Sequence, residues 1–278
     1  MTFLIISHTC HYTIDQQLFA YAPYVREMNL WLKYVDQVDI VAPVANAFDQ
    51  NINLPYQHTN IKISEVPAFS LIGLREKLLT LLKLPKIFNT IYKAMKQADH
   101  IHLRCPGNMG LLGCLVQILF PGTPKTAKYA GNWDPQARQP WSYNLQKWIL
   151  RNTFLTRNMQ VLVYGNWPNE TKNIRSFFTA TYRRNEIQPI KTRDYTQSLH
   201  FCFIGSLVNG KRPLLALQFI QELRKEKVDA VLHFYGNGEL KTDLEEKIKT
   251  EQLEDAVFVY GNQPKEKVQQ VLYHSHFM

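Results

Sequence analysis

A glycine loop followed by two cations is the feature of this sequence that most directly indicates chemistry. An apolar stretch runs into Gly205 and Ser206, and Lys211 and Arg212 stand just before a proline that is suited to open a helix. The N–H groups and dipole of a helix N-terminus attract anions, and the two cations add formal charge there. The segment indicates a diphosphate site, with a plain strand–helix loop as the alternative.

A second glycine turn follows the next apolar stretch, in the sequence HFYGNGEL. Gly236 and Gly238 accept backbone conformations that other residues disfavour, and they allow a ligand to approach closely. Glu239 stands where a helix is expected to start, and the helix dipole favours an acid there. The turn is a second candidate for the diphosphate side, with a structural turn and a dipole-stabilising acid as the alternative. Gly-x-Gly alone is less specific than a full dinucleotide fingerprint.

Polar side chains also follow apolar stretches in the first part of the chain, where ligands of open α/β sheets bind. His8 and His11 come after the first stretch, in SHTCHY. Each is predicted to hydrogen-bond a hydroxyl or phosphate group of a ligand, with an ordinary loop histidine as the alternative. Arg104, in HLRCPGN, is predicted to hold an anionic group, and a buried arginine paired with an acid is the alternative.

The segment KYAGNWD carries three more candidates. Trp133 is predicted to stack on the apolar face of a ligand, Asp134 to take a hydroxyl proton, and Asn132 to contact the same ligand. A helix N-cap aspartate beside a packed tryptophan is the alternative.

Short apolar stretches alternate with helical patterns along the chain, which predicts βαβ units and parallel sheets. Strands are expected at 2–7, 38–42, 61–66, 100–103, 126–130, 160–164, 200–204, 230–235, 257–259 and from 276 onward. Helices are expected at 22–34, 71–96 with a break at Pro85, 108–120, 141–151, 214–225, 240–250 and 264–273.

Residues 165–195 lose this periodicity and are interpreted as an interdomain region. The prediction is an N-terminal Rossmann-like domain over 1–195 and a partial C-terminal one over 196–278. Because the sequence stops where a strand has just begun, we expect the second domain to be incomplete.

Composition and charge narrow the class of partner. Hydrophobic residues make up 45% of the sequence, which is enough for a real core. The first 195 residues hold 22 Lys and Arg against 12 Asp and Glu, and the remainder is nearly balanced. A basic half suggests an anionic partner, and scattered solubilising lysines are the alternative.

Targeting and metal signals are weak. The four cysteines form no CxxC pair and are interpreted as buried thiols of a reducing compartment. No apolar run reaches the roughly 18 residues of a membrane span, so a cytoplasmic protein is expected. The basic amphipathic stretch 71–88 suggests contact with an anionic membrane, at its inner face, and a core helix with solvated lysines is the alternative.

Three segments taken together resemble the donor domain of retaining glycosyltransferases of family 4, which have the GT-B fold. They are IGSLVNGKRP, HFYGNGEL and VFVYGNQPKEKVQQVLYHSH, and the first half of the chain resembles the matching acceptor domain of a bacterial branch. The resemblance implies two Rossmann-like domains facing a cleft. It also implies metal-independent transfer, with retention, from an NDP-sugar co-substrate to a saccharide or lipid-linked acceptor, without a cofactor. On the acceptor side it implies that Trp133 stacks on a sugar face, that Asn132 contacts the acceptor, and that His8 and His11 contact an acceptor hydroxyl or a donor phosphate.

The resemblance has two departures. Many relatives carry an arginine where this chain has Ser206, which shifts the diphosphate role to Lys211 and Arg212. The family's later E-x7-E segment is not in the sequence. The alternatives are a non-catalytic truncated product or acceptor-binding module, and a nucleic-acid-binding protein, for which no recognisable module is present.

Overall fold

The chain forms two compact units, and each is described by itself. The computed structural model describes residues 1–45, 47–67, 74–178, 184–189 and 191–278, with only the backbone of 74–81. Unit 1 comprises Met1–Phe48 and Asn53–Thr181, and unit 2 comprises Asp49–Ile52 and Tyr182–Met278. The structure thus groups the described residues of 184–195 with unit 2, whereas the sequence placed the boundary after residue 195.

Unit 1 is built on a seven-stranded parallel sheet with the spatial order β10-β9-β8-β7-β1-β4-β6. The strands are β1 (Thr2–Ile6), β4 (Gln37–Ala42), β6 (Ile61–Glu65), β7 (His100–Cys105), β8 (Lys125–Tyr129), β9 (Met159–Val163) and β10 (Ile174–Ser176). The chain proceeds from β1 toward one edge and then returns to continue from β7 toward the other. This reversal between β1 and β7 is the topological switch point of a doubly wound sheet, where ligands of such folds bind.

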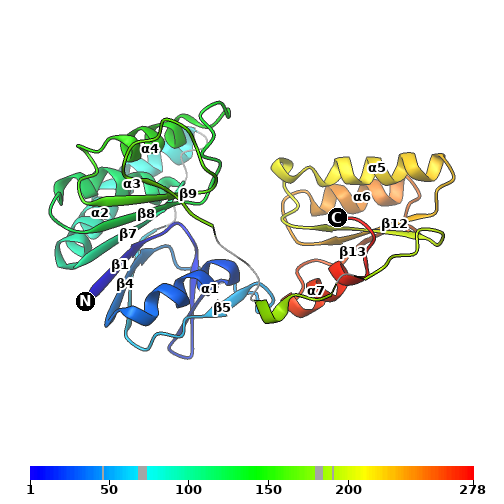
Figure 1. The fold of residues 1–278 in the computed structure, drawn as a ribbon, viewed down its shortest axis with the longest axis horizontal. Helices are drawn as coiled ribbons and strands as arrows, with labels where there is room; N and C mark the ends of the chain where they lie inside the picture. Colours follow the sequence, from blue (N-terminus) through cyan, green and yellow to red (C-terminus); the bar gives the residue numbers. More distant parts are fainter. Residues whose placement is uncertain (46, 68–73, 179–183, 190) are drawn as a thin grey trace. The chain divides into compact units, whose positions relative to one another are not determined.

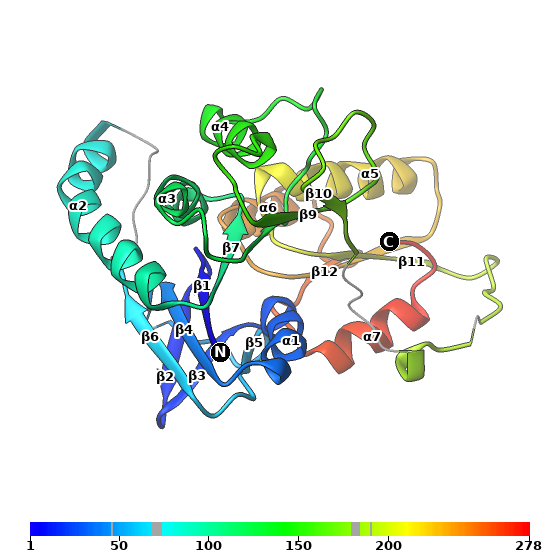
Figure 2. The ribbon, with the colours of Figure 1, turned by 60° about the vertical axis from the view of Figure 1, so that its left-hand side comes forward.

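The two faces of this sheet have separate cores, because successive strand residues point to opposite sides. Leu4 and Ile6 pack on one face, and Phe3 and Ile5 on the other. Helices α2 (Leu74–Gln97), α3 (Asn108–Val116) and α4 (Trp141–Arg151) lie on the first face, and α1 (Ala22–Trp31) lies on the second (Figures 1 and 2). Short 3-10 turns follow two of these helices, at Leu32–Tyr34 and Gln117–Leu119.

Helix α2 continues through Pro85, so the predicted break at this residue is wrong. A proline in a helix interior removes one backbone hydrogen bond. Downstream of it, Ile87, Ile91 and Met95 are buried in the core. Their burial offsets the missing bond, which is a tertiary effect that a local breaker signal does not contain.

A small antiparallel sheet and the edge strand β10 were not predicted. The small sheet has the order β2-β3-β5, with β2 (His11–Ile14), β3 (Gln17–Tyr21) and β5 (Asn53–Pro55). Asp15 and Gln16 connect β2 to β3 with positive φ angles of 47° and 64°, which is the backbone of a two-residue hairpin turn. Asn-Gly and Asp-Gly are the usual signals for such a turn, and neither is present here. Strand β10 lies inside the stretch 165–195, which the sequence analysis treated as lacking regular structure.

Unit 2 has a three-stranded parallel sheet in the order β11-β12-β13, and Phe277 pairs with Phe201 on the outer side of β11. The strands are β11 (Leu199–Ile204), β12 (Ala230–Tyr235) and β13 (Val257–Val259). Helices α5 (Pro213–Lys225) and α6 (Lys241–Thr250) cover one face, and α7 (Lys265–His274) lies on the other (Figure 1). Two 3-10 turns, Arg184–Glu186 and Asn209–Lys211, complete the unit. The predicted helices of this unit and its strands at 200–204, 230–235 and 257–259 are confirmed to within a residue or two, whereas the strand expected from 276 onward is only the isolated bridge at Phe277.

Three of the four cysteines are buried free thiols, as expected, whereas Cys10 is exposed. Cys10 lies in the short loop between β1 and β2, and this loop turns its side chain out of the core. The expectation of a buried thiol is therefore wrong at this position.

Candidate functional site

The carboxyl ends of β1 and β7 meet at the switch point of unit 1. Ser7 and His8 follow β1, and Pro106 and Gly107 follow β7 and open helix α3. A Cβ atom built on Gly107 would lie 2.9 Å from Nδ1 of His8, and this glycine has a φ of +150°. Only glycine lets the histidine ring approach the start of α3 in this way.

His8 is a neutral, accessible group at this edge. The residue is exposed, while its ring rests against Gly107. Partial burial of the ring, and then the charge of Arg104, lower its pKa. A neutral imidazole both donates and accepts a hydrogen bond, which is the state required for contact with a hydroxyl. The predicted role of His8 is compatible with this position and stays a prediction.

His11 occupies a different environment, in the core of unit 1. Its ring is fully buried and stacks on Tyr56 at a centroid distance of 5.7 Å. Nε2 lies 2.8 Å from the Tyr56 hydroxyl and Nδ1 lies 2.8 Å from the carbonyl oxygen of Thr9. Burial lowers its pKa to about 4, against the smaller opposing effect of the Thr9 carbonyl. Because both ring nitrogens have hydrogen-bond partners inside the protein, this environment favours a packing role for His11 over the predicted contact with substrate.

Arg104 is held by an acid, which corresponds to the alternative considered for it. Its Nη1 donates to Oε2 of Glu27 at 3.0 Å, and its guanidinium lies 5.3 Å from the centroid of the Tyr24 ring. The second oxygen of Glu27 accepts a hydrogen bond from Nζ of Lys128 at 2.7 Å. The side chains of Arg104, Glu27 and Lys128 are 11%, 4% and 2% exposed. This trio links α1, β7 and β8 beneath the carboxyl edge of the sheet.

The sequence analysis did not identify Glu27 or Lys128. Glu27 is an ordinary acid on an amphipathic helix, and Lys128 is one of many lysines in a basic half. Charged residues are almost never fully buried without partners. Glu27 and Lys128 differ from the other charged residues only in being buried, and no local sequence pattern predicts that burial.

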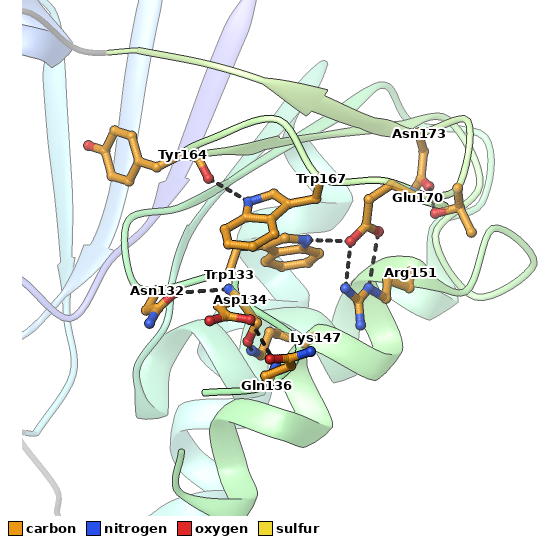
Figure 3. Close-up of polar contacts among 11 residues, drawn as sticks. Asn132, Trp133, Asp134, Gln136, Lys147, Arg151, Tyr164, Trp167, Glu170 and Asn173 are labelled. Carbon is orange, nitrogen blue, oxygen red and sulfur yellow. Dashed lines mark hydrogen bonds and ion pairs between the residues drawn. The ribbon is translucent and has the colours of Figure 1, made fainter. Parts of the chain in front are cut away.

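Figure 3 shows the surroundings of the predicted acceptor residues Asn132, Trp133 and Asp134, in the loop that follows β8. Trp133 is 1% exposed, and its Nε1 donates to Oε1 of Glu170 at 2.8 Å. Glu170 also accepts two hydrogen bonds from Arg151, at 3.1 Å and 2.5 Å. Trp133 is therefore a packed core residue, which corresponds to the alternative considered for it.

Asn132 and Asp134 instead shape the loop around the buried tryptophan. Oδ1 of Asn132 accepts the backbone N–H of Asp134 at 2.9 Å, and Oδ1 of Asp134 accepts that of Gln136 at 2.8 Å. Lys147 donates to the backbone carbonyl of Asp134 at 3.0 Å, not to its carboxylate (Figure 3). Asp134 is not the N-cap of α4, since Pro140 holds that position. Asn132 is exposed and Asp134 is half-buried, so both remain candidates for acceptor contact.

The two glycine loops of unit 2 pack against each other at the carboxyl ends of β11 and β12. The backbone N–H of Leu207 donates to the carbonyl of Asn237, and that of Leu240 to the carbonyl of Leu207, both at 3.0 Å. A Cβ atom on Gly238 would lie 2.4 Å from the Leu207 carbonyl oxygen. Gly236 and Gly238 thus serve loop packing first, which is the turn alternative for them, and their contact with a donor stays a prediction.

Gly205 has a φ of +155° and open space where its Cβ would lie. Open space therefore lies beside its Cα at the end of β11, while its N–H is bonded to the carbonyl of Tyr235. Ser206, Lys211 and Arg212 are exposed around it. Arg212 is the N-cap residue of α5 in the left-handed conformation, and no described side chain caps the helix. The loop thus presents a helix N-terminus and two cations, which are the elements of an anion site.

Glu239 is exposed in the turn that precedes α6, which begins two residues later than this acid. Within the described residues, no group of three or more His, Cys, Asp or Glu side chains is arranged to hold a metal ion. A search of the described helices finds none that is both long and apolar enough to cross a bilayer.

Two units, each with a Rossmann-like parallel sheet, and paired glycine loops in the second unit, define the GT-B class of fold. Residues 184–278 match the family model of glycosyl transferases group 1. The match falls on unit 2, the part of the chain whose glycine loops carry the resemblance. No curated protein matches the chain in sequence.

Solved structures support the same fold. WaaG, "a glycosyltransferase involved in lipopolysaccharide biosynthesis", matches with a TM-score of 0.57 and 9% identity, over 99% of this chain and 73% of WaaG. The "lipopolysaccharide outer core galactosyltransferase WaaB" matches with a TM-score of 0.55 and 15% identity, over 99% of this chain and 72% of WaaB. A putative UDP-N-acetylglucosamine 2-epimerase from Listeria monocytogenes matches with a TM-score of 0.52 and 11% identity, over 99% of this chain and 72% of that protein.

The chain is shorter than the proteins that it matches. It spans 37% of the length of S. aureus TarM, which aligns with 64% of this chain at 18% identity and a TM-score of 0.45. The likenesses to WaaG, WaaB and the epimerase confirm the expected fold class of two Rossmann-like units.

Proposed function

We propose that this chain belongs to an enzyme that transfers a sugar from an NDP-sugar to a saccharide or lipid-linked acceptor, with retention and without a metal ion. The family match over residues 184–278 carries the proposal, because it contains both glycine loops of unit 2. The fold alone does not identify this activity, since a putative epimerase has the same fold.

In this proposal unit 2 holds the donor through its diphosphate. The bond between the anomeric carbon and the diphosphate oxygen breaks, so negative charge grows on the leaving group. Fixed donors and charges that face such a growing charge lower the barrier. Lys211 and Arg212 supply the formal charge, and the N-terminus of α5 supplies N–H groups and the helix dipole.

Unit 1 holds the acceptor, whose hydroxyl oxygen forms the new bond to the anomeric carbon. His8 and Asp134 are the proposed contacts for that hydroxyl, and Asn132 lies in the same loop as Asp134. The released proton passes to Asp134 or to the leaving phosphate. His11 and Trp133 are packed in the core of unit 1, so they are weaker candidates for contact with the acceptor.

The anionic membrane is a further proposed partner, which would place the protein at the inner face of a cytoplasmic membrane. Residues 71–73 and the side chains of 74–81 lie outside the described residues. In the remainder of this stretch Leu82, Lys83 and Lys86 are exposed on α2. Exposed apolar and basic side chains on one helix favour binding to anionic lipid.

The test is binding and turnover of nucleotide sugars. Thermal stabilisation by UDP or GDP, measured on the purified chain, detects donor binding. Chromatography of mixtures with UDP- and GDP-sugars then separates three outcomes. Release of NDP with a glycosylated product supports transfer, and an epimerised NDP-sugar supports the activity of the fold neighbour. Failure of every nucleotide to bind contradicts the proposal and favours a non-catalytic, acceptor-binding module.

A further inference from the structure

We infer that the outer face of helix α4, together with the loop that follows it, docks on a membrane surface that contains anionic lipid. The proposed function names such a membrane as a partner and places the contact on α2, so the inference rests on that proposal for the kind of partner. It adds a second contact surface, which exposure and charge define independently of α2.

The side of α4 that faces solvent is aromatic. Trp141 and Trp148 lie seven residues apart, so they project from the same side of the helix, and they are 66% and 59% exposed. Asn144 and Leu145 lie between them on that side and carry no charge. Ile149 packs in the core on the opposite side. Surface helices usually place charged residues on their outer face, so folding alone does not explain this aromatic one.

The exposed apolar surface continues over two loops at the end of α4. Phe154, three residues beyond the helix, is 71% exposed, and Leu119, at the end of the 3-10 turn after α3, is 57% exposed. The two loops lie side by side, because Nε2 of Gln117 donates to the carbonyl oxygen of Leu155 at 3.0 Å. Figures 1 and 2 show α4 next to α3 on the same face of the sheet. Single exposed apolar residues are ordinary, whereas a group of them marks an interaction site.

The same surface is basic and lacks acids. Residues 135–169, which include α4 and the loop after it, contain four Lys or Arg and no Asp or Glu. Two of these cations, Lys147 and Arg151, are engaged by hydrogen bonds within unit 1. The other two, Arg138 and Arg157, are exposed. A surface with exposed cations and no acid attracts an anionic partner.

Tryptophan and phenylalanine side chains next to arginine suit the interface of a bilayer. An indole ring buries its apolar part and keeps its N–H near the lipid headgroups. The guanidinium of Arg157 lies 4.5 Å from the centroid of the Phe154 ring, so a cation and an apolar anchor occur at the same point of the surface. A guanidinium binds a lipid phosphate through two hydrogen bonds.

The charge also argues against a second copy of the chain as the occupant of this face. Two copies joined through it would bring like charges together, with no acid of the face to pair them. An anionic bilayer neutralises these charges instead. Helix α2 lies on the same face of the sheet as α4, so a contact through α4 adds to a contact through α2 and does not exclude it (Figure 2).

The measurement is co-sedimentation of the purified chain with vesicles of phosphatidylcholine, alone or mixed with phosphatidylglycerol, together with tryptophan fluorescence. The variant is Trp141→Gln combined with Trp148→Gln. Leu30→Gln combined with Tyr34→Gln is the matched control, because these side chains are 56% and 84% exposed and belong to α1 and the turn after it, on the other face of the sheet. Circular dichroism verifies that both variants are folded, which is expected for exposed positions.

The native chain is expected to bind the mixed vesicles more tightly than the neutral ones. Its tryptophan emission should then shift to shorter wavelength, because the indole rings leave water. The tryptophan variant is expected to bind the mixed vesicles more weakly by about tenfold or more and to lose the shift, since two apolar anchors are removed. The control variant should bind as the native chain does. Added salt should weaken native binding through its charge contribution.

A native chain that binds no vesicles, or a tryptophan variant that binds them as the native chain does, overturns the inference. An equal loss in the control variant does so too, since binding is then not specific to α4. Size-exclusion chromatography without vesicles tests the second copy, and a native dimer that the tryptophan variant abolishes assigns the face to self-association, with the same consequence. Failure of the proposed function looks different, because UDP then binds to no variant while the vesicle series keeps its order.

Discussion

A Cβ atom placed on Gly236 would lie 1.9 Å from the carbonyl oxygen of Gly205, so the two glycine loops of unit 2 touch through their backbones. The contact joins the ends of β11 and β12, and the backbone N–H of Gly205 donates to the carbonyl of Tyr235 at 3.0 Å. The loop that carries Lys211 and Arg212 therefore depends on a glycine in the neighbouring loop for its position.

Gly236→Ala is expected to destabilise unit 2 by about 2–5 kcal/mol, because the new methyl group meets backbone that cannot move aside and the φ of +149° disfavours any side chain. Urea unfolding followed by circular dichroism measures the change. Gly210→Ala is the matched control, since nothing lies within 4 Å of its Cβ position. Equal stability of the two variants would contradict the packing described here.

Lys211→Ala is expected to weaken nucleotide-sugar binding about 10- to 100-fold, the contribution of a charged hydrogen bond. Because Lys211 is exposed, the free energy of unfolding should stay within about 0.5 kcal/mol of the native value. Calorimetry with UDP, and with GDP, measures the affinity. Lys249→Ala, at an exposed lysine on α6, should bind as the native chain does. Unchanged affinity in Lys211→Ala would remove this residue from the donor site.

Glu170→Gln is expected to destabilise unit 1 by about 1–3 kcal/mol. The substitution removes the charge that holds Arg151 and weakens the acceptor for Nε1 of Trp133 (Figure 3). Fluorescence of the buried tryptophan and urea unfolding report the loss. Glu65→Gln, at an exposed acid of unit 1, should change stability little. A Glu170→Gln variant as stable as this control would show that the contacts of Glu170 with Arg151 and Trp133 contribute nothing to the free energy of unfolding.

The pH dependence of stability tests the state of His11. Its pKa is about 4 in the folded chain, against about 6.5 for a free histidine, so the unfolded chain binds the proton first. The stabilisation by neutral His11 is fully present above about pH 6.5 and is lost as the pH falls toward 4, by about 3 kcal/mol in total. His11→Gln should flatten that part of the curve relative to the native chain. An unaltered slope would mean that the ring is not buried in neutral form.

Lys83→Gln combined with Lys86→Gln is expected to weaken binding to vesicles that contain anionic lipid, measured by co-sedimentation, about 30-fold. Each basic residue near such a surface contributes about 1 kcal/mol, and added salt should weaken the binding further. The pair Lys62→Gln and Lys172→Gln, at exposed lysines elsewhere in unit 1, is the control. Equal loss in both pairs would indicate binding through overall charge and not through α2.

The sequence by itself determined the layout of the fold. The mainly apolar stretches 230–235 and 257–259 coincide with β12 and β13, because the strands of a parallel sheet place most of their residues in the core. Gly205 and Pro213 marked the loop and the start of α5 through local backbone preferences that need no tertiary context. The hairpin at Asp15 and Gln16 was not predicted, because neither residue type indicates a positive φ from the sequence alone.

Tertiary structure decided which polar residues are available for chemistry. His8 and His11 are three residues apart, yet one lies at the sheet edge and the other in the core against Tyr56. Trp133 likewise donates a hydrogen bond to Glu170, and Arg104 forms an ion pair with a glutamate 77 positions away in the chain. Burial and pairing arise from contacts between segments that are distant in the sequence. A local pattern of residues therefore predicts where a strand lies, but it does not predict whether the side chain after the strand is exposed.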